Sequence, residues 1–162
     1  MITQGITHIV FDWGDTIMRD DPSRVDAMYL WPLVELVEMD AAKTLAHLAE
    51  SYTLLIATSA AASDAVMVRK ALSRVGVDEW FSDIFTARRT GVPKTDIRFW
   101  QFIVDDLCVD PNRLLVVGDS FEGDVLCPVR VGIQSMWFNW RSTEDRIGEN
   151  YRTIHRLSEL IA

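Results

Sequence analysis

The stretch FDWGDT (residues 11–16) closes the first strongly apolar run of the chain, ITHIVFDW (6–13). A run this apolar predicts a buried strand, yet it ends on Asp12, and Asp15 follows three residues later. A buried carboxylate without a partner is costly, so a charge in this place needs a partner or a chemical role. The stretch therefore predicts a buried strand whose end carries function.

Four more short apolar runs follow along the chain. Several of them are continuous rather than alternating, which is typical of parallel strands whose two faces are both covered by helices. These runs are YTLLIAT (52–58), DIFTA (83–87), RLLVVGD (113–119) and QSMWFNW (134–140).

Helical patterns fill the gaps between these runs. Asp40 is placed to cap the first helix and Gly76 to end the second. Pro128 is tolerated if the fourth helix begins late, because it then falls in the first turn. The tail at 151–162 predicts a small edge strand and a last helical turn. The four helical segments are 40–51, 63–76, 95–107 and 121–132.

The alternation of strands and helices with short connections predicts an α/β fold, a three-layer, doubly wound parallel sheet. No repeat or linker interrupts the alternation, so we expect one domain over residues 1–162, with a short flap at about 17–38. In such sheets the functional crevice lies outside the carboxyl ends of the strands.

Composition limits the partners of the chain. The formal net charge of -8 argues against non-specific nucleic-acid binding, which needs a basic surface. No segment approaches the ~18 apolar residues that span a bilayer, and the beginning, MITQGITH, does not resemble a signal peptide. We therefore expect a cytoplasmic protein that binds neither nucleic acid nor membrane.

Side chains suited to metal or phosphate binding follow several of the predicted strands. Because the carboxyl ends of parallel strands meet at one edge of a sheet, we expect these side chains to converge there. They are Asp12 and Asp15 after the first run, Thr58 and Ser59 at the second, Asp119 and Asp124 after the fourth, and Lys94 ahead of the third helix.

These residues form four motifs that resemble, in order, those of the haloacid dehalogenase-like hydrolase superfamily. The family's first motif is Asp-x-Asp-x-Thr after an apolar strand, and FDWGDT meets it in part. LLIATS matches the strand that ends in Thr or Ser, and KTD matches the lysine ahead of a helix. VVGDSFEGD matches Gly-Asp followed, after four residues, by another Asp. The resemblance implies a Rossmann-like core and magnesium-dependent phosphatase activity.

The resemblance also assigns roles to individual residues. It implies that Asp12 attacks phosphorus and carries an aspartyl-phosphate intermediate. Magnesium prefers hard oxygen ligands, and anionic phosphoryl oxygens need cationic and hydroxyl partners. The implied metal ligands are Asp12, the backbone carbonyl of Gly14, Asp119 and Asp124, and the implied phosphate-binding residues are Thr58, Ser59 and Lys94.

The spacing of the first motif departs from the family pattern. The family's second aspartate, its general acid/base, lies two residues after the nucleophile, where this sequence has Gly14 and places Asp15 one position later. General acid-base catalysis typically contributes ~10²–10⁴ in rate. Asp15 therefore reaches back to act as the acid, or the enzyme prefers good leaving groups such as acyl phosphates, or catalysis has been lost.

Two branches of the family that lack the second aspartate fit less well. Dehalogenases use no metal, whereas the acidic fourth motif points to one, and phosphonate-cleaving relatives need a cap domain that carries a lysine. The segments 17–52 and 60–94 are too short, or too fully used by core elements, to form a sizeable cap. A cleft without a cap is open to bulky substrates or to closure by a partner subunit.

We therefore predict a capless, Mg²⁺-dependent phosphatase that acts through Asp12 on a phosphorylated small molecule or macromolecule. The alternative is a catalytically weak or silent domain of the same fold that binds a phosphorylated ligand or protein partner. A receiver domain would carry its phosphoryl acceptor at the end of the third strand, where DIFTA ends without an aspartate. Oligomeric state stays open, as does Trp31, which either covers the cleft or packs in the core.

Overall fold

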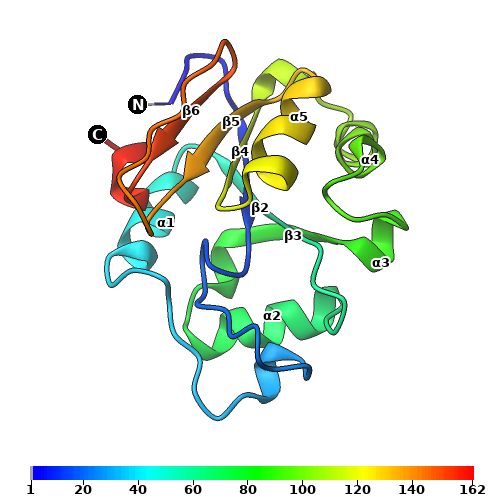
Figure 1. Cartoon of the computed structure of the whole chain (residues 1–162), viewed down its shortest axis with the longest axis vertical. Coiled ribbons are helices and arrows are strands. Elements are labelled where there is room, and N and C mark those ends of the chain that lie inside the picture. Colours follow the sequence, from blue (N-terminus) through cyan, green and yellow to red (C-terminus); the bar gives the residue numbers. More distant parts are fainter. Residues whose placement is uncertain (1) are drawn as a thin grey trace.

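Six parallel strands form one sheet in a computed structural model that describes residues 2–162 (Figure 1). The strands lie in the order β3-β2-β1-β4-β5-β6, so the chain moves outward from β1 in one direction, returns, and then moves outward in the other. Their bounds are β1 (His8–Asp12), β2 (Thr53–Thr58), β3 (Phe81–Thr86), β4 (Leu114–Gly118), β5 (Gln134–Phe138) and β6 (Tyr151–Ile154).

Helices cover both faces of the sheet, which confirms the predicted three layers (Figure 1). Alternate residues of β1 face opposite layers: Ile9 and Phe11 belong to the core beneath α1 and α2, and Val10 to the core beneath α4 and α5. The helices are α1 (Ala41–Ala49), α2 (Ala65–Arg74), α3 (Ala87–Thr90), α4 (Ile97–Leu107) and α5 (Cys127–Arg130).

The predicted elements occur in the predicted order, with two local differences. A π-helical turn at Phe121–Leu126 precedes α5, and Pro128 lies in the first turn of α5, as a late helix start requires. Asp40 does precede α1, but the prediction that its side chain caps the helix is wrong. The residue has helical backbone angles, and its side chain accepts no capping hydrogen bond.

Residues 17–38, called the flap below, form a loop closed at its base by backbone hydrogen bonds. The N–H of Val37 donates to the carbonyl of Ile17 at 2.9 Å. A 3-10 turn at Met28–Leu30 packs on α2, and Arg74 of α2 donates hydrogen bonds to three carbonyls of the flap. Trp31 is buried within the main core. The flap is therefore packed against the sheet layers and forms no separate cap.

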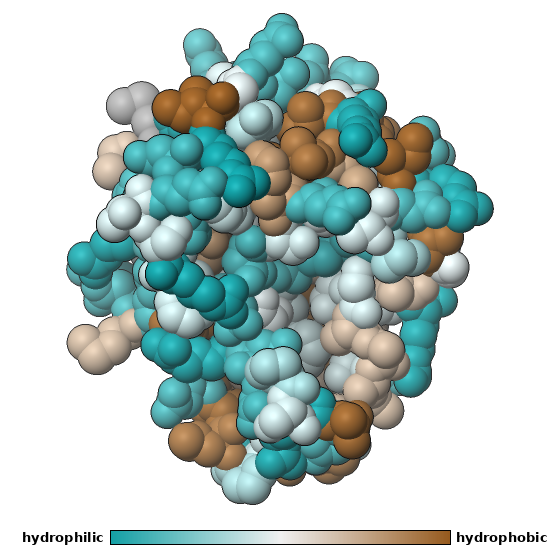
Figure 2. All heavy atoms as spheres, in the orientation of Figure 1, coloured by the Kyte–Doolittle hydropathy of each residue, from teal (hydrophilic) through white to brown (hydrophobic). Residues whose placement is uncertain are grey.

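The surface of the flap is not continuously apolar. Val25, Leu30 and Leu33 are exposed. Figure 2 shows small brown areas separated by teal at the lower end of the molecule, where the flap lies in Figure 1.

No helix within residues 2–162 combines the length and the apolar character needed to cross a bilayer.

Trp100 joins the two segments that carry Lys94 and Asp124. Its ring is fully buried, and its Nε1–H donates to the carbonyls of Lys94 at 3.0 Å and of Gly123 at 3.1 Å. One indole therefore fixes the loop ahead of α4 against the π-helical turn.

We predict that Trp100→Phe lowers the free energy of unfolding by about 1–3 kcal/mol or more, because two buried carbonyls lose their donor. Urea unfolding measures this loss. Trp80→Phe is the matched control, since the partly buried Trp80 ring donates no hydrogen bond to any described residue. Equal losses of stability in the two variants would contradict the proposal that the Trp100 hydrogen bonds fix the loop ahead of α4 against the π-helical turn.

Candidate active site

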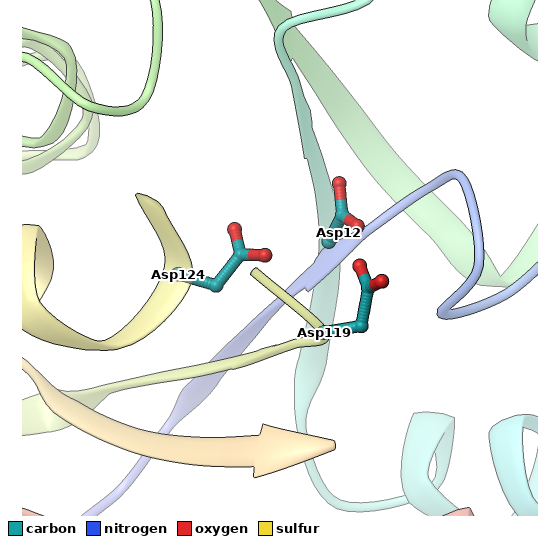
Figure 3. Close-up of side chains that lie close together, drawn as sticks. All are labelled: Asp12, Asp119 and Asp124. Carbon is teal, nitrogen blue, oxygen red and sulfur yellow. The ribbon is translucent and has the colours of Figure 1, made fainter. Parts of the chain in front are cut away.

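Three aspartates from separate segments meet at the carboxyl edge of the sheet (Figure 3). Asp12 is the last residue of β1, Asp119 directly follows β4, and Asp124 lies in the π-helical turn. One carboxylate oxygen from each lies within 4.8 Å of the others. Because β1 and β4 are neighbours at the point where the strand order reverses, this is where ligands bind in doubly wound sheets.

Lys94 lies between two of these carboxylates. Its Nζ donates to Asp12 Oδ1 at 2.5 Å and to Asp124 Oδ1 at 2.6 Å, and all three side chains are buried. Burial alone would lower the pKa of Lys94, but the charges of Asp12 and Asp124 outweigh it and raise that pKa. The ammonium therefore stays charged and offsets part of the repulsion within the cluster.

Asp119 and Asp124 hold protons more tightly than an ordinary carboxyl group. Burial, opposed by Lys94 and supported by the charge of Asp12, raises the pKa of Asp124 to about 6. Burial and the charge of Asp12 raise the pKa of Asp119 to about 7. Such a cluster is short of positive charge, and a cation placed among the three aspartates would relieve the shortage.

Backbone and hydroxyl groups fix the positions of these carboxylates. Thr16 Oγ1 donates to Asp12 Oδ2 at 3.2 Å and accepts from the N–H of Asp119, also at 3.2 Å, so one hydroxyl joins the ends of β1 and β4. The N–H of Ser120 donates to Asp124 Oδ2 at 3.0 Å. A Cβ at Gly118 would lie 2.3 Å from the Asp124 carboxylate, which explains a glycine there.

A cavity of about 330 Å³ opens beside the cluster. Thr58 ends β2 and is 3 % exposed. Its Oγ1 accepts from the N–H of Ala60 at 3.1 Å, and Ser59 Oγ accepts from the N–H of Lys94 at 2.9 Å. Ser59 therefore ties the Lys94 loop to the end of β2. The predicted site residues that line this cavity are Asp12, Gly14, Thr58, Ser59 and Lys94.

Asp15 lies beside the cavity without lining it. Its φ of 56° is left-handed, a region that aspartate adopts more readily than most residues. Arg141 donates to Asp15 Oδ2 at 2.5 Å and to Asp119 Oδ2 at 2.9 Å, and the N–H of Asp20 donates to Asp15 Oδ1 at 3.1 Å. Both oxygens of the Asp15 carboxylate are thus engaged.

Two charged residues of the site were not found by sequence reasoning. Arg141 stands at the end of a strand-like run, but nothing in that run indicates that it reaches Asp15 and Asp119. Asp20 lies in the flap and lines the same cavity as Asp12. Partial burial of the carboxyl group, partly offset by a hydrogen bond from the N–H of Asp21, raises the pKa of Asp20. Its sequence neighbourhood, RDDPS, is typical of a solvated turn.

The acidic cluster fits a magnesium ion. Magnesium takes octahedral oxygen ligands at about 2.0–2.1 Å, so its ligand oxygens lie roughly 3–4 Å apart. Asp12, Asp119 and Asp124 offer three hard oxygen donors within 4.8 Å of one another. The fit rests on the chemistry and spacing of these donors, and we expect that they hold the ion together with water.

The fold and the acidic site define an α/β protein with a candidate metal site at the carboxyl ends of its strands. A family model described as haloacid dehalogenase-like hydrolase matches residues 33–132, more than half of the chain. The chain belongs to this family. The matched range contains the segments of Thr58, Lys94 and Asp119, whereas the first motif lies outside it, so the placement of Asp12 rests on the geometry above.

Two curated relatives and one solved structure are similar to parts or all of the chain. Pyrimidine 5'-nucleotidase YjjG of Escherichia coli is 25 % identical over 95 residues, 56 % of this chain and 42 % of that protein. Glyceraldehyde 3-phosphate phosphatase of Methanothermobacter thermautotrophicus is 27 % identical over 73 residues, 45 % of this chain and 32 % of that protein. The matches thus span less than half the length of either curated relative.

The solved structure shares the fold over nearly its whole length. An uncharacterized protein from Listeria monocytogenes serotype 4b superposes with a TM-score of 0.81 at 22 % identity, covering 96 % of this chain and 94 % of that one. The three-layer core is therefore an architecture that a solved structure also has.

We predict that Mg²⁺ raises the melting temperature more at about pH 8 than at about pH 5.5. The pKa values of Asp119 and Asp124, about 7 and 6, lie above the ordinary 3.8, so without metal their protonation stabilises the fold as pH falls. Protons and metal compete for the same oxygens over this range. Thermal unfolding with Mg²⁺ and with EDTA at both pH values measures the difference.

Asp119→Asn is the companion variant in that experiment, and its melting temperature should respond weakly to Mg²⁺ at either pH. If Mg²⁺ raised the melting temperature of the unaltered protein equally at both pH values, metal binding by Asp119 and Asp124 would be contradicted.

Proposed function

We propose that this chain is a magnesium-dependent phosphohydrolase that acts through an aspartyl-phosphate on Asp12. The observation that carries the proposal is the position of the Asp12 carboxylate, which belongs to the acidic cluster and also lines the cavity beside Thr58 and Lys94. Membership of a hydrolase family supports hydrolysis in general. The names of the two relatives, a nucleotidase and a phosphatase, favour a phosphate ester or anhydride as substrate.

The reaction would run in two displacements. A carboxylate oxygen of Asp12 forms a bond to phosphorus while the bond from phosphorus to the leaving oxygen breaks. Water then attacks the phosphorus of the aspartyl-phosphate, inorganic phosphate leaves, and the Asp12 carboxylate is restored. When bound, magnesium supplies positive charge that reduces the repulsion between the anionic nucleophile and the anionic phosphate.

Residues around Asp12 suit the binding of a phosphoryl group. Lys94 presents a buried ammonium at 2.5 Å from Asp12 Oδ1, close enough to contact a group attached to that carboxylate. The Thr58 hydroxyl accepts a hydrogen bond from Ala60 and keeps its own proton to donate. We assign both side chains to the phosphoryl oxygens, together with backbone N–H groups after Asp12 and with Ser59, which also holds the Lys94 loop.

The substrate side of the cleft is open. The flap packs on α2 and contributes Met28 and Asp20 to the cavity, and no described segment forms a domain above it. Either a phosphorylated small molecule or a phosphorylated macromolecule would reach Asp12. We include in this proposal a cytoplasmic location, where the protein would have access to such substrates.

One observation favours a second candidate, a catalytically silent domain that binds a phosphorylated ligand. Gly14 occupies the position of the family's general acid, and the displaced Asp15 is held in an ion pair with Arg141. If no other group supplies the proton, the site would bind phosphate and magnesium but hydrolyse poorly any substrate whose leaving group needs an acid.

We expect Asp12→Asn to reduce Mg²⁺-dependent hydrolysis of p-nitrophenyl phosphate and of acetyl phosphate by ~10³-fold or more, because an amide cannot replace the nucleophile. Phosphate release measures both reactions. Asp110→Asn, which makes the same chemical change at an exposed position on the opposite edge of the sheet, should leave both rates unchanged.

The comparison separates the two candidates. An inert wild type that binds Mg²⁺ and phosphate supports the silent domain. An active wild type with an equally active Asp12→Asn variant would contradict the role of Asp12.

A further inference from the structure

Asp20 fills the space beside Gly14, the position at which the first motif lacks its second carboxylate. A Cβ built on Gly14 would lie 3.4 Å from both the Cβ and Oδ2 of Asp20. Asp20, Gly14 and Asp12 all line the same cavity, together with Thr58. A carboxylate from six residues later in the chain therefore stands where a side chain at position 14 would point.

A tight turn brings Asp20 back to this place. The N–H groups of Ile17 and Met18 both donate to the carbonyl of Trp13 at 3.0 Å, and the N–H of Asp15 donates to the carbonyl of Met18. The chain after β1 is thus folded back on itself. The N–H of Asp20 then donates to Asp15 Oδ1 at 3.1 Å, which fixes the backbone of Asp20 against the turn.

The carboxylates of Asp15 and Asp20 differ in how many of their oxygens accept a hydrogen bond. Asp15 accepts from Arg141 on one oxygen and from the Asp20 N–H on the other, and it does not line the cavity. Asp20 Oδ1 accepts from the N–H of Asp21 at 2.9 Å, whereas within residues 2–162 no group donates a hydrogen bond to Oδ2. The free oxygen of Asp20 is the one nearest to Gly14.

We propose that Asp20 is the general acid/base of the reaction and that Asp15 is a positioning residue that holds it. The proposal rests on the phosphohydrolase function proposed above. In the first displacement the protonated Asp20 carboxyl gives its proton to the leaving oxygen as the bond from that oxygen to phosphorus breaks, so an alcohol leaves. In the second, the Asp20 carboxylate takes a proton from the attacking water and returns to its starting state.

This arrangement explains how a chain with Gly14 retains an acid. The carboxylate is supplied by the flap rather than by the strand end, while the carbonyl of Gly14 stays available as the expected metal ligand. Arg141 contributes indirectly. It donates to one oxygen of the Asp15 carboxylate and so fixes that carboxylate, whose other oxygen accepts the hydrogen bond from the N–H of Asp20. Asp15 and Arg141 thus act through Asp20 and touch no leaving group.

The test compares two substrates in the full chain with Mg²⁺. Phenyl phosphate has a poor leaving group that needs a proton, and acetyl phosphate has a good one that does not. The ratio kcat/KM covers steps up to the first irreversible one, so it reports formation of the aspartyl-phosphate, where the acid acts. We expect Asp20→Asn to lower kcat/KM for phenyl phosphate by ~10²–10⁴-fold and for acetyl phosphate by less than about tenfold.

Asp21→Asn is the matched control. It makes the same change at the next residue, whose carboxylate is exposed and bonded to Ser23, and it should change neither ratio by more than about twofold. Asp15→Asn should show a smaller loss than Asp20→Asn on phenyl phosphate. The Mg²⁺-induced rise in melting temperature checks that each variant keeps its fold and metal site.

Equal losses on the two substrates in Asp20→Asn would overturn the role of Asp20, as would a leaving-group-dependent loss found in Asp15→Asn alone. An active wild type with either result leaves the phosphohydrolase function standing. A wild type inert on both substrates would overturn that function and the role of Asp20 together.

Discussion

Three carboxylates held within 4.8 Å of one another at the end of a parallel sheet require positive charge, and much of this structure serves that requirement. Lys94 supplies one cation from a loop that Ser59 and Trp100 fix in place. Arg141 supplies a second from beyond β5. A shortage of charge remains, as the raised pKa of Asp119 indicates, and a divalent ion is the natural group to meet it.

The turn after β1 shows how a glycine and an aspartate at adjacent positions change the site. Asp15 occupies a left-handed conformation that costs most side chains roughly 1 kcal/mol or more. Its ion pair with Arg141 and the hydrogen bond from the N–H of Asp20 help to offset that cost. Asp15 thus joins the flap to the strand end, and Gly14 leaves room for Asp20 in the cavity that Asp12 also lines.

Much of the fold could be predicted from local patterns, and the metal-ligand role of the acidic cluster from the resemblance of four motifs to a known family. Continuous apolar runs indicate buried parallel strands. Asp12 ends β1, Asp119 directly follows β4, and Lys94 lies in the loop before α4. Asp20 and Arg141 could not be predicted, because their positions depend on how a loop folds back and on a contact between residues 15 and 141. Asp40 failed as a cap for a similar reason, since a suitable residue type does not fix its backbone angles.

The central claim is that Asp12 and Asp119 share one divalent ion in the position of the acidic cluster. A crystal structure of the protein with Mn²⁺ in place of Mg²⁺, with the ion located by its anomalous signal, tests this claim most directly. We expect a single peak at the carboxyl ends of β1 and β4, with oxygens of both aspartates bound to it. A peak bound by Asp119 without Asp12, or one located elsewhere, would show that the two aspartates do not share an ion.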